Sequence, residues 1–554
     1  MNDSPLAIGI DYGTLSGRVL ILDLRSAEEL ACVEVPYAHG VIERSLPGQE
    51  LPLGPEWALQ HPADYVEVLT RGIPRALSEA QADPARVIGI GVDFTCCTVL
   101  PAGADGTPLC LSERWRAHPH AWPKLWKHHA AQDQADRLTE VARTREEAFL
   151  ARYGGRISSE WYFPKLLQIY EEDRAVYDAA EVFIEATDWI VWQLTGVQSR
   201  CACSASYKAF HSPQHGLPPD AYFEAVAAGF SGARSRLGDS FSQLGERAGG
   251  LRRELAELTG LTPSIAVATG NVDSFVSVPG AGVQREGSFV TVVGTSICDM
   301  IVNRREVLLP GVTGVVRDGI LPGFYGYEAG QPAVGDMLGW WVDDILGAGG
   351  GAAPGHARLQ RDAGALRPGA SGLVAIDWWN GNRSVLADQS LSGSIVGLTL
   401  SSTAPEIYRA LLESIAFGNR KIIDNFDAHG LTVERIVACG GIAEKSPLLM
   451  QLFADVSGRP VDVPASTQIP ARGAAMFGAV AAGLPAGGFA TITDAVAVLA
   501  PPLARSYLPD AAAADVYARI YTVYEALHDT LGRAHPQWLR TLRAERRAAA
   551  AAGP

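Results

Sequence analysis

The stretch Leu6-Ala-Ile-Gly-Ile-Asp-Tyr-Gly-Thr14 decides the fold of this chain, together with the run Gly17-Arg-Val-Leu-Ile-Leu-Asp23 that follows it. The first run is apolar until it reaches an acid and a glycine, and the second run resumes the apolar character after a tight turn. Short apolar runs that are bounded by Gly and Asp are typical of buried strands. We therefore predict a strand, a turn and a second strand at the start of the chain.

Strand-like and helical patterns alternate along the rest of the chain. Residues 406–426 place apolar side chains at helical spacing, and Ser446-Pro447 offers an N-cap and a first-turn proline for a further helix. Further candidate strands are residues 87–92, 264–269, 288–293 and 435–439. Strands that alternate with helices predict an α/β protein.

The length of 554 residues is too great for one core, since a typical domain has about 150 residues, so we predict two large domains. A strand that runs into a small-residue turn occurs at Asp11-Tyr-Gly-Thr14 and again at Gly294-Thr-Ser296, which indicates two related halves. A Gly-rich, charged segment at 284–287 separates them. The predicted units are an N-terminal domain over residues 1–284, a C-terminal domain over 285–539, and a frayed helix or flexible tail over 540–554.

Composition and charge exclude several classes of protein. With 47% apolar and 19% charged residues, the chain is not disordered. A net charge of -15 argues against a surface for nucleic acid or anionic membrane. The Ala-rich residues 474–500 are interrupted by Pro485 and Asp494, so they do not predict a membrane span. The eight cysteines lack disulfide spacing and the first residues lack a secretory signal, so we expect a cytoplasmic protein with free thiols.

Several familiar catalytic motifs are missing from the sequence. It has no P-loop, no His-Glu-x-x-His and no Gly-x-Ser-x-Gly. Gly347-Ala-Gly-Gly-Gly-Ala352 imitates a dinucleotide fingerprint, but it follows a helical pattern instead of a strand. We predict a flexible loop there.

Three turns are suited to phosphate or nucleotide binding. In the first, Gly13 lets backbone amides approach a phosphate, Thr14 donates a hydroxyl, and Asp11 ends a strand where it can hold a hydrated Mg²⁺. Gly294-Thr-Ser296 offers a second set of donors, and Cys439-Gly-Gly441 offers a flat backbone surface for a base or ribose. Each turn alone is common as a plain connection, so only the combination indicates a phosphate site.

A candidate base stands at the end of Gly270-Asn-Val-Asp273. Asp273 follows a buried-type strand and a glycine, where a carboxylate can accept the proton of a hydroxyl that attacks a γ-phosphate. The alternative is an aspartate that caps a helix beginning at Ser274. Position alone does not separate the two interpretations.

These residues resemble the FGGY family of carbohydrate kinases, which has the actin-like ATPase superfold, and within it the bacterial members that act on L-ribulose. The likeness covers nearly the whole chain, because many short motifs occur in the family's order. The motifs are Ile10-Asp-Tyr-Gly-Thr14, Gly91-Val-Asp-Phe-Thr95, Leu125-Trp-Lys-His128, Ile157-Ser-Ser-Glu-Trp161, Glu185-Ala-Thr-Asp-Trp189, Tyr207-Lys208, Gly270-Asn-Val-Asp273, Gly294-Thr-Ser296, Gly330-Gln-Pro-Ala-Val-Gly-Asp336, Asp377-Trp-Trp-Asn-Gly-Asn-Arg383 and Gly440-Gly-Ile-Ala443.

The resemblance implies two actin-like domains, of ribonuclease H-like fold, with a cleft between them. It also implies ATP-dependent phosphorylation of the terminal hydroxyl of a ketopentose. We expect L-ribulose as the acceptor and L-ribulose 5-phosphate as the product, a step of L-arabinose catabolism, with ATP and Mg²⁺ as cofactors. The expected partners are small molecules, with no nucleic acid and no membrane, and a homodimer is left open.

The resemblance assigns roles to individual residues. Asp273 would be the catalytic base in the N-terminal domain, and Asp11 would hold Mg²⁺ through water. The sugar contacts would be Cys96, Trp126, Lys208, Asp273 and Glu328. The nucleotide contacts, centred on the C-terminal domain, would be Gly13, Thr14, Arg18, Gly294, Thr295, Gly440, Gly441 and Ala443.

Each sugar contact has a plainer alternative. Trp126 and Cys96 are equally well explained as packing residues. For Lys208 the alternative is a solvated surface cation, and for Glu328 it is the structural partner of an arginine. His128 and His129 are predicted to be surface residues and not ligands.

Other functions remain as alternatives. The nearest is another acceptor in the same family, such as D-ribulose, xylulose or ribitol. A non-catalytic sugar or nucleotide sensor would need neither Asp11 nor Asp273, and an NAD-dependent oxidoreductase would need a glycine fingerprint after a strand.

Overall fold

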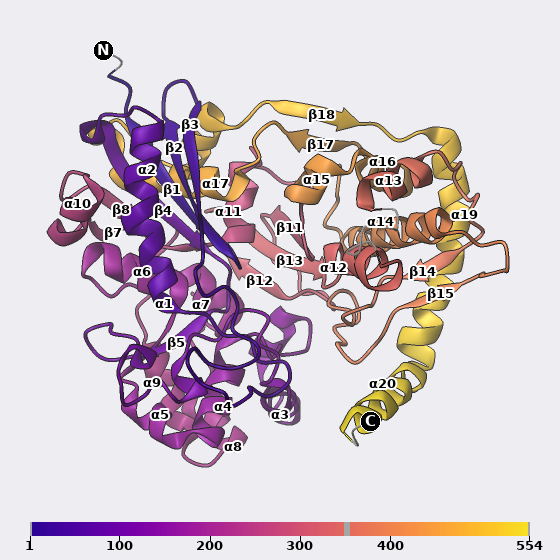
Figure 1. Ribbon diagram of the computed structural model, residues 1–554, viewed down its shortest axis with the longest axis horizontal. Coiled ribbons are helices and arrows are strands. Elements are labelled where there is room, and N and C mark those ends of the chain that lie inside the picture. Colours follow the sequence, from indigo (N-terminus) through magenta and orange to yellow (C-terminus); the bar gives the residue numbers. More distant parts are fainter. Residues whose placement is uncertain (1–2, 348–354, 552–554) are drawn as a thin grey trace.

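The computed structural model describes residues 3–347 and 355–551. Two large sheets organise the chain, one in each half of the sequence, and helices cover them (Figure 1). Tight hairpins join β1 (Leu6–Tyr12) to β2 (Ser16–Asp23) and β10 (Ser288–Val293) to β11 (Ile297–Asn303), whereas long connections that contain helices join the parallel strands. The predicted α/β architecture is thereby present in both halves.

The first sheet contains the strand pair that the opening residues predict. In spatial order its strands are β3 (Glu29–Pro36), β2 (Ser16–Asp23), β1 (Leu6–Tyr12), β4 (Val87–Phe94), β8 (Ala266–Ala268) and β7 (Arg247–Gly250), with β9 (Asn271–Val272) also paired to β4. β1 runs antiparallel to β2 and parallel to β4. β4 runs parallel to β8 and β9, so the carboxyl ends of β1, β4 and β9 meet at one edge of the sheet.

The second sheet repeats this pattern. In spatial order its strands are β12 (Gly314–Arg317), β13 (Tyr325–Gln331), β11 (Ile297–Asn303), β10 (Ser288–Val293), β16 (Arg435–Cys439), β17 (Val461–Pro464) and β18 (Leu503–Tyr507). The pairs β13–β11 and β11–β10 are antiparallel, the pairs β10–β16 and β16–β17 are parallel, and the pair β17–β18 is antiparallel. The same sequence of pairings runs from β3 to β7 in the first sheet. The predicted relationship between the halves is confirmed at the level of topology.

The two halves exchange one helix each. Helix α11 (Asp273–Gly280) follows β9 but packs against β10 and β11, whereas helix α17 (Ile469–Ala482) packs against β1 and β4. A Cβ on Gly9 would lie 1.8 Å from Ala471 O, and one on Gly91 would lie 1.8 Å from Ala474 O. Glycine is therefore required in β1 and β4 for the backbone of α17 to approach. The domain division at residue 284 stays a prediction.

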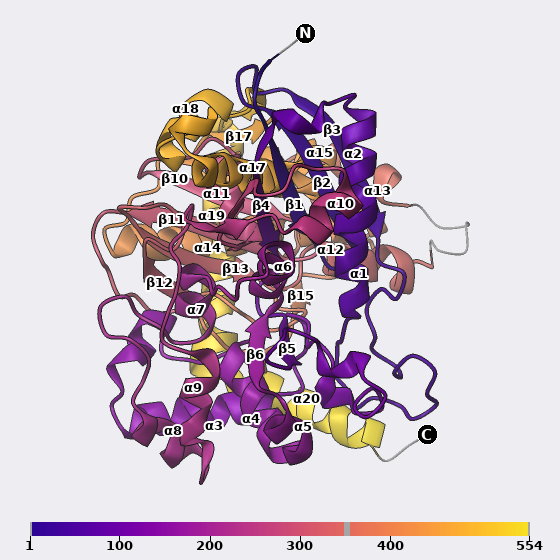
Figure 2. The ribbon, with the colours of Figure 1, turned by 90° about the vertical axis from the view of Figure 1, so that its left-hand side faces the viewer.

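Helices cover the opposite face of the first sheet, and a helical lobe extends from it. The covering helices are α1 (Pro62–Glu67), α2 (Ile73–Glu79), α6 (Ala186–Thr195) and α10 (Arg253–Thr259). The lobe, at the bottom of Figures 1 and 2, has its own apolar core. It contains β5 (Val99–Ala102), α3 (Gln132–Thr144), α4 (Tyr162–Glu172), α5 (Arg174–Ala179), β6 (Val182–Glu185), α8 (Asp220–Val226) and α9 (Ala233–Leu237).

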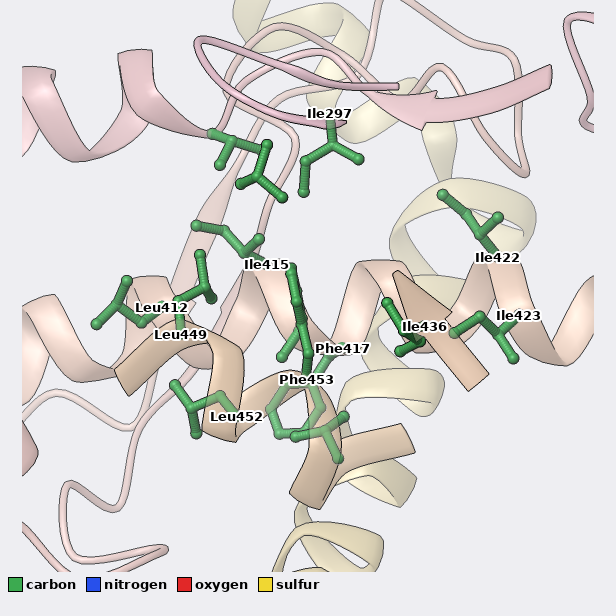
Figure 3. Close-up of a cluster of buried hydrophobic side chains, with 14 of the residues drawn as sticks. Ile297, Leu412, Ile415, Phe417, Ile422, Ile423, Ile436, Leu449, Leu452 and Phe453 are labelled. Carbon is green, nitrogen blue, oxygen red and sulfur yellow. The ribbon is translucent and has the colours of Figure 1, made fainter. Parts of the chain in front are cut away.

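A long amphipathic helix forms the centre of the second half. Helix α14 (Ala404–Ala428) confirms the helix predicted over residues 406–426, and Thr403 and Glu406 form a capping box at its start. Its apolar face packs against α16 (Pro447–Ser457), and Figure 3 shows Leu412 beside Leu449 and Phe417 beside Phe453 in this core. Further elements of this half are α12 (Gly335–Gly339), α13 (His356–Gly364), β14 (Val374–Ile376), β15 (Ser394–Val396), α18 (Ile492–Leu499) and α19 (Ala511–Asp529).

The end of the described chain is helical. Helix α20 (Pro536–Ala551) covers most of the segment for which the sequence predicted a frayed helix or flexible tail. Arg540 donates to Asp388 and Ser390, and Arg543 donates to the backbone carbonyl of Gln389. These arginines fasten the first part of the helix to the second half, and a frayed helix or flexible tail over residues 540–554 stays a prediction.

Two other predictions concern single segments. Residues 348–352 of the predicted glycine loop lie outside the described residues. Within residues 3–347 and 355–551, no helix combines the length and the apolar character that crossing a membrane demands. The eight cysteines are all unpaired thiols.

Candidate active site

A row of polar side chains crosses the first sheet where β1 ends. Strand pairing sets Asp11 beside Arg18 of β2 and beside Asp93 of β4, and it sets Asp93 beside Asn271 of β9. Paired residues on neighbouring strands project from the same face of a sheet. Arg18 Nη1 lies 3.3 Å from Asp11 Oδ2, so one end of the row is an ion pair.

Asp11 and Asp93 are two buried carboxyls, and the positive charge of Arg18 is not enough to compensate both if they are ionised. Burial raises the pKa of Asp11, and Arg18 offsets part of that rise. Burial, followed by the negative charges of Asp11 and Asp273, raises the pKa of Asp93 well above its usual range. In the part of the chain that the structure describes, neither carboxyl oxygen of Asp93 accepts a hydrogen bond from an N–H or hydroxyl group, and a protonated Asp93 shares its proton with Asp11. Two such carboxyls at a sheet edge are a donor set that suits Mg²⁺.

Asp273 is the first residue of α11, directly after β9. The backbone N–H of Ser274 donates to its Oδ1 at 2.7 Å, which fixes the carboxyl and leaves Oδ2 available to a ligand. Burial, reinforced by Asp11, raises the pKa of Asp273 to about 7, although the Ser274 N–H opposes the rise. A carboxyl with a pKa near neutral is suited to act as a base. The cap residue of α11 is Val272, so Asp273 is not the helix cap.

Lys208 and Glu328 form a buried ion pair that joins the two halves of the chain. Lys208 ends helix α7 (Ala202–Lys208), Glu328 lies in β13, and Lys208 Nζ is 2.6 Å from Glu328 Oε2. The two side chains are only 3% and 7% exposed. Burial alone would lower the pKa of Lys208, but the charge of Glu328 outweighs it and raises that pKa, and Cys96 and Cys97 are further neighbours of the lysine. Lys208 Nζ also lies 5.9 Å from the ring of Phe275, two residues beyond Asp273, and both members of the pair act on the pKa of Asp273. We call Cys96, Lys208, Asp273 and Glu328 the sugar-site cluster.

Lys165 ties together two loops beside this cluster. Its side chain is buried in α4 and its Nζ donates to three backbone carbonyls. The acceptors are Cys97 O at 2.5 Å, Lys124 O at 3.2 Å and Leu125 O at 2.9 Å. The lysine thus holds the loop that carries Cys96 next to the loop that carries Trp126.

Trp126 connects the sugar-site loops to the first phosphate turn. Its indole N–H donates to Thr14 Oγ1 at 3.1 Å, and Gln60 Nε2 donates to Thr14 O at 2.8 Å. In the turn itself, Gly13 N donates to Ser16 O at 3.0 Å. The structure therefore brings Trp126 to the turn of Gly13 and Thr14. The roles of these three residues stay predictions.

The predicted nucleotide residues of the second half lie beside one another. Gly294 and Thr295 form the turn between β10 and β11, and Thr295 O accepts from Val334 N at 2.9 Å. Gly440 has a φ of +94°, and a Cβ there would lie 2.7 Å from Val293 O, so only glycine fits against the strand that leads into this turn. Gly441 begins α15 (Gly441–Lys445), and Ala443 is buried within it.

Helix α15 was not predicted. Sequence patterns indicated that the glycine turn leads directly to the helix capped by Ser446. The cap is confirmed, because the Ser446 side chain accepts from Leu449 N at the start of α16. The five residues of α15 are too few to show a helical pattern of their own.

The structure decides three of the plainer alternatives. Lys208 is buried, so it is not a surface cation, and Glu328 is paired with Lys208 instead of an arginine. The prediction that His128 is a surface residue is wrong, because its ring is buried. Ala58 N lies 3.3 Å from its Nδ1, and Gln168 Oε1 lies 2.9 Å from its Nε2. A histidine with partners for both nitrogens tolerates burial. His129 is half-buried, with Ser159 Oγ 3.4 Å from its Nδ1.

Comparisons with known proteins agree with this geometry. Residues 6–280 match the N-terminal domain, and residues 289–482 the C-terminal domain, of the FGGY family of carbohydrate kinases. A ribulokinase from Halalkalibacterium halodurans is 48% identical over 547 residues, covering 97% of each chain. One from Mycolicibacterium smegmatis is 43% identical over 552 residues, covering 98% of this chain and 97% of that protein.

A solved structure shows the same fold. The ligand-bound xylulose kinase from Lactobacillus acidophilus has a TM-score of 0.79 at 17% identity, covering 96% of this chain and all of that one. The matches define a carbohydrate kinase built from two actin-like domains. The chain belongs to the FGGY family, so the predicted family and fold class are confirmed.

Sequence reasoning missed two charged residues of this region. Asp93 lies inside the quoted motif Gly91-Val-Asp-Phe-Thr95, but only the strand register places it beside Asp11. Arg383 lies inside the quoted motif that starts at Asp377, and its partner Glu160 is 223 residues away in the sequence. Charged residues within otherwise apolar or aromatic motifs were the available signal.

Proposed function

We propose that this chain is an ATP-dependent kinase that phosphorylates the terminal hydroxyl of L-ribulose, which yields L-ribulose 5-phosphate and ADP in L-arabinose catabolism. The observation that carries the proposal is the near-complete alignment with proteins named ribulokinase. The near-neutral pKa of Asp273, on which Asp11, Glu328 and Lys208 act, supports it, since phosphoryl transfer to an alcohol requires a base next to a charge-compensated phosphate site.

The residues of the chain have distinct parts in the proposed reaction. Asp273 Oδ2 accepts the proton of the terminal hydroxyl as that oxygen forms a bond to the γ-phosphorus of ATP. The bond from that phosphorus to the β–γ bridging oxygen breaks, and ADP leaves. Lys208 and Glu328 bind sugar hydroxyls as a charged donor and a charged acceptor, which make strong hydrogen bonds. Their burial means that the sugar enters while these side chains are apart, and closure then excludes water.

The nucleotide contacts are part of the same proposal. Gly13 and Thr14 from the first half, with Arg18, approach the phosphates. Gly294 and Thr295 supply donors from the second half, and Gly440, Gly441 and Ala443 line the base or ribose. The support is that equivalent turns follow β1 and β10, the equivalent strands of the two sheets.

The residues present fit a bound Mg²⁺. Asp93 has two buried oxygens that accept no hydrogen bond from an N–H or hydroxyl group of the described chain, and they lie beside Asp11. The described residues contain no set of three or more His, Cys, Asp or Glu arranged to hold a metal ion by themselves. Magnesium is commonly bound by one or two carboxylates together with water and substrate phosphates. We propose that Asp11 and Asp93 hold it, and a bound Mg²⁺ would neutralise charge on the phosphate oxygens.

Asp93→Asn tests this part of the proposal. Removing one of the crowded carboxylates should raise the free energy of unfolding of the ligand-free protein by about 1–3 kcal/mol. It should also abolish the additional rise in Tm that Mg²⁺ gives in the presence of ADP. Urea unfolding and thermal scans at pH 8 measure both effects.

Asp188→Asn is the matched control for that experiment. Asp188 is also buried, but its Oδ1 accepts from Cys201 N at 2.9 Å and it lies outside the carboxyl row. This variant should keep the wild-type response to Mg²⁺. An unchanged response in Asp93→Asn as well would contradict the assignment of Asp93.

A panel of acceptors tests the function itself. L-Ribulose, D-ribulose, D-xylulose, L-xylulose, ribitol and L-arabinitol are compared by ADP release, and the product is located by NMR. We expect the highest kcat/KM for L-ribulose and a phosphate on its terminal carbon. Another acceptor that is preferred more than tenfold would replace L-ribulose in the proposal, and no turnover of any acceptor would contradict a kinase.

Two further predictions accompany the function. A cytoplasmic location is expected of an enzyme that uses ATP and keeps its thiols unpaired. A homodimer stays a prediction, which sedimentation of the purified chain measures.

A further inference from the structure

Arg383 lies in a loop of the second half that is fastened beside the sugar-site cluster. The Asp377 side chain accepts from Gln331 Nε2 and from Tyr524 OH, each at 2.8 Å, at the start of this loop. Next to Arg383, Ser384 Oγ accepts from Gly330 N at 3.2 Å. Gly330 is two residues beyond Glu328 in β13, so the loop is bound to the strand that carries Glu328.

The arginine reaches across to the first half. Its Nη2 lies 3.4 Å from Oε1 of Glu160, and each of the two side chains is 13% exposed. Glu160 directly precedes Trp161, whose ring lies 5.9 Å from Lys208 Nζ. The pair therefore stands at the edge of the sugar-site cluster, nearly buried but not sealed from a small ligand.

The guanidinium of Arg383 has N–H donors that no described residue uses. A guanidinium carries five N–H donors, and the residues that the structure describes offer this one a single hydrogen bond, to Glu160. Burial alone would lower the pKa of Arg383, but Glu160, Cys298, Glu328 and Cys96 raise it. The contact of the neighbouring Ser384 with Gly330 holds the arginine beside the strand that carries Glu328.

The chemistry of the acceptor indicates which of its groups the arginine meets. Asp273 comes from the first half of the chain, whereas Arg383 comes from the loop that is bound to β13 of the second half. A ketopentose whose terminal hydroxyl meets Asp273, and whose middle hydroxyls meet Lys208 and Glu328, still needs a donor for its carbonyl oxygen. Arg383 has N–H donors that no described residue uses.

We propose that Arg383 is a substrate-binding and specificity residue that donates hydrogen bonds to the keto end of the acceptor, at the C2 carbonyl and C1 hydroxyl. The proposal rests on the sugar-kinase function given above and adds a group from the second half that recognises a ketose. A carbonyl oxygen only accepts hydrogen bonds, and a guanidinium only donates them, so the two are complementary. Glu160 is a positioning residue that orients the arginine.

Arg383→Met tests the proposal by its effect on different acceptors. Loss of a hydrogen bond from a charged donor should raise KM for the ketose on the order of 10- to 100-fold, with kcat within about threefold and KM for ATP unchanged. The two pentitols that reduction of L-ribulose gives, ribitol and L-arabinitol, lack the carbonyl. Their kcat/KM should fall less, so the preference for ketose over pentitol should shrink at least tenfold.

Arg156→Met is the matched control. Arg156 Nη1 donates to Ala387 O at 2.9 Å, so it makes a second contact between the halves through the same loop without being a neighbour of the sugar-site cluster. It should leave KM for the ketose within about twofold of wild type. Arg383→Lys keeps the charge but not the planar fork, and should give an intermediate KM.

The outcomes separate this proposal from the proposed function. The acceptor panel identifies the ketose that the wild type uses best, and that ketose serves in the test, whether or not it is L-ribulose. A wild-type KM in Arg383→Met overturns the proposal. So does an equal effect of Arg156→Met, which would make Arg383 a structural link, or an equal fall for ketose and pentitols, which would remove the keto end from the assignment.

Discussion

Asp273→Asn should lower kcat by about 10²- to 10⁴-fold while KM for the sugar changes far less. An asparagine keeps the shape of the side chain and its contact with the Ser274 N–H, but it cannot accept the hydroxyl proton. The remaining rate would come from positioning and from charge compensation at the phosphates. Steady-state assays of ADP release at saturating ATP measure the change.

The pH dependence gives the same prediction a second readout. Because burial raises the pKa of Asp273 to about 7, the carboxyl is protonated below that pH and cannot serve as a base. The kcat/KM of the wild type should therefore fall tenfold per pH unit below about pH 7, and the residual activity of Asp273→Asn should lack this limb. An unaltered acid limb in the variant would assign the titration to another group.

Stability provides the folding control for this variant. A carboxyl whose pKa is raised on folding stabilises the protein at low pH, and that contribution is lost as the pH rises from the ordinary value of 3.8 through about 7. Asp273→Asn removes the cost of the buried charge. It should therefore be more stable than wild type at pH 8, with the difference disappearing near pH 4.

Lys208→Met should reduce the free energy of unfolding by about 3–5 kcal/mol, because it leaves Glu328 buried without a counterion. The methionine replaces the aliphatic part of the lysine, so the loss reports the uncompensated charge and not a cavity. Binding of the sugar should weaken in parallel. Urea unfolding gives the stability, and calorimetric titration with the sugar gives the affinity.

The double variant Lys208→Met/Glu328→Gln is the control for this prediction. With both charges removed, most of the lost stability should return, although sugar binding should not. A single variant that is as stable as wild type would mean that the pair is not buried in solution. If the double variant were no more stable than Lys208→Met, the stability lost in Lys208→Met would come from altered packing and not from the uncompensated charge of Glu328.

The fold was largely readable from local patterns. The opening strands, the strands at residues 87–92, 288–293 and 435–439, and the long helix at 406–426 all follow from short-range periodicity, and all are present. The helix exchange was not predictable, because it depends on Gly9 and Gly91 meeting the backbone of α17 across more than 370 residues of chain. Local sequence does not record which sheet a helix will cover.

The site was readable only where a turn or a family motif marked it. Asp11 and Asp273 end strands beside glycines, which is a local signal. Asp93 needed the register of β1 and β4, and Arg383 needed the approach of two halves of the chain. His128 was misjudged for the same reason, since its partners Ala58 and Gln168 lie 70 and 40 residues away. Contacts between residues that lie far apart in the chain are therefore what the sequence patterns did not reveal.

The most direct test of the central claim is a crystal structure of the wild type with the acceptor ketose, Mg²⁺ and a non-hydrolysable ATP analogue. The structure should place a carboxyl oxygen of Asp273 within about 2.6–3.2 Å of the terminal hydroxyl, and that hydroxyl in line with the γ-phosphorus. A terminal hydroxyl that hydrogen-bonds elsewhere, with Asp273 turned away from it in the closed complex, would contradict the account.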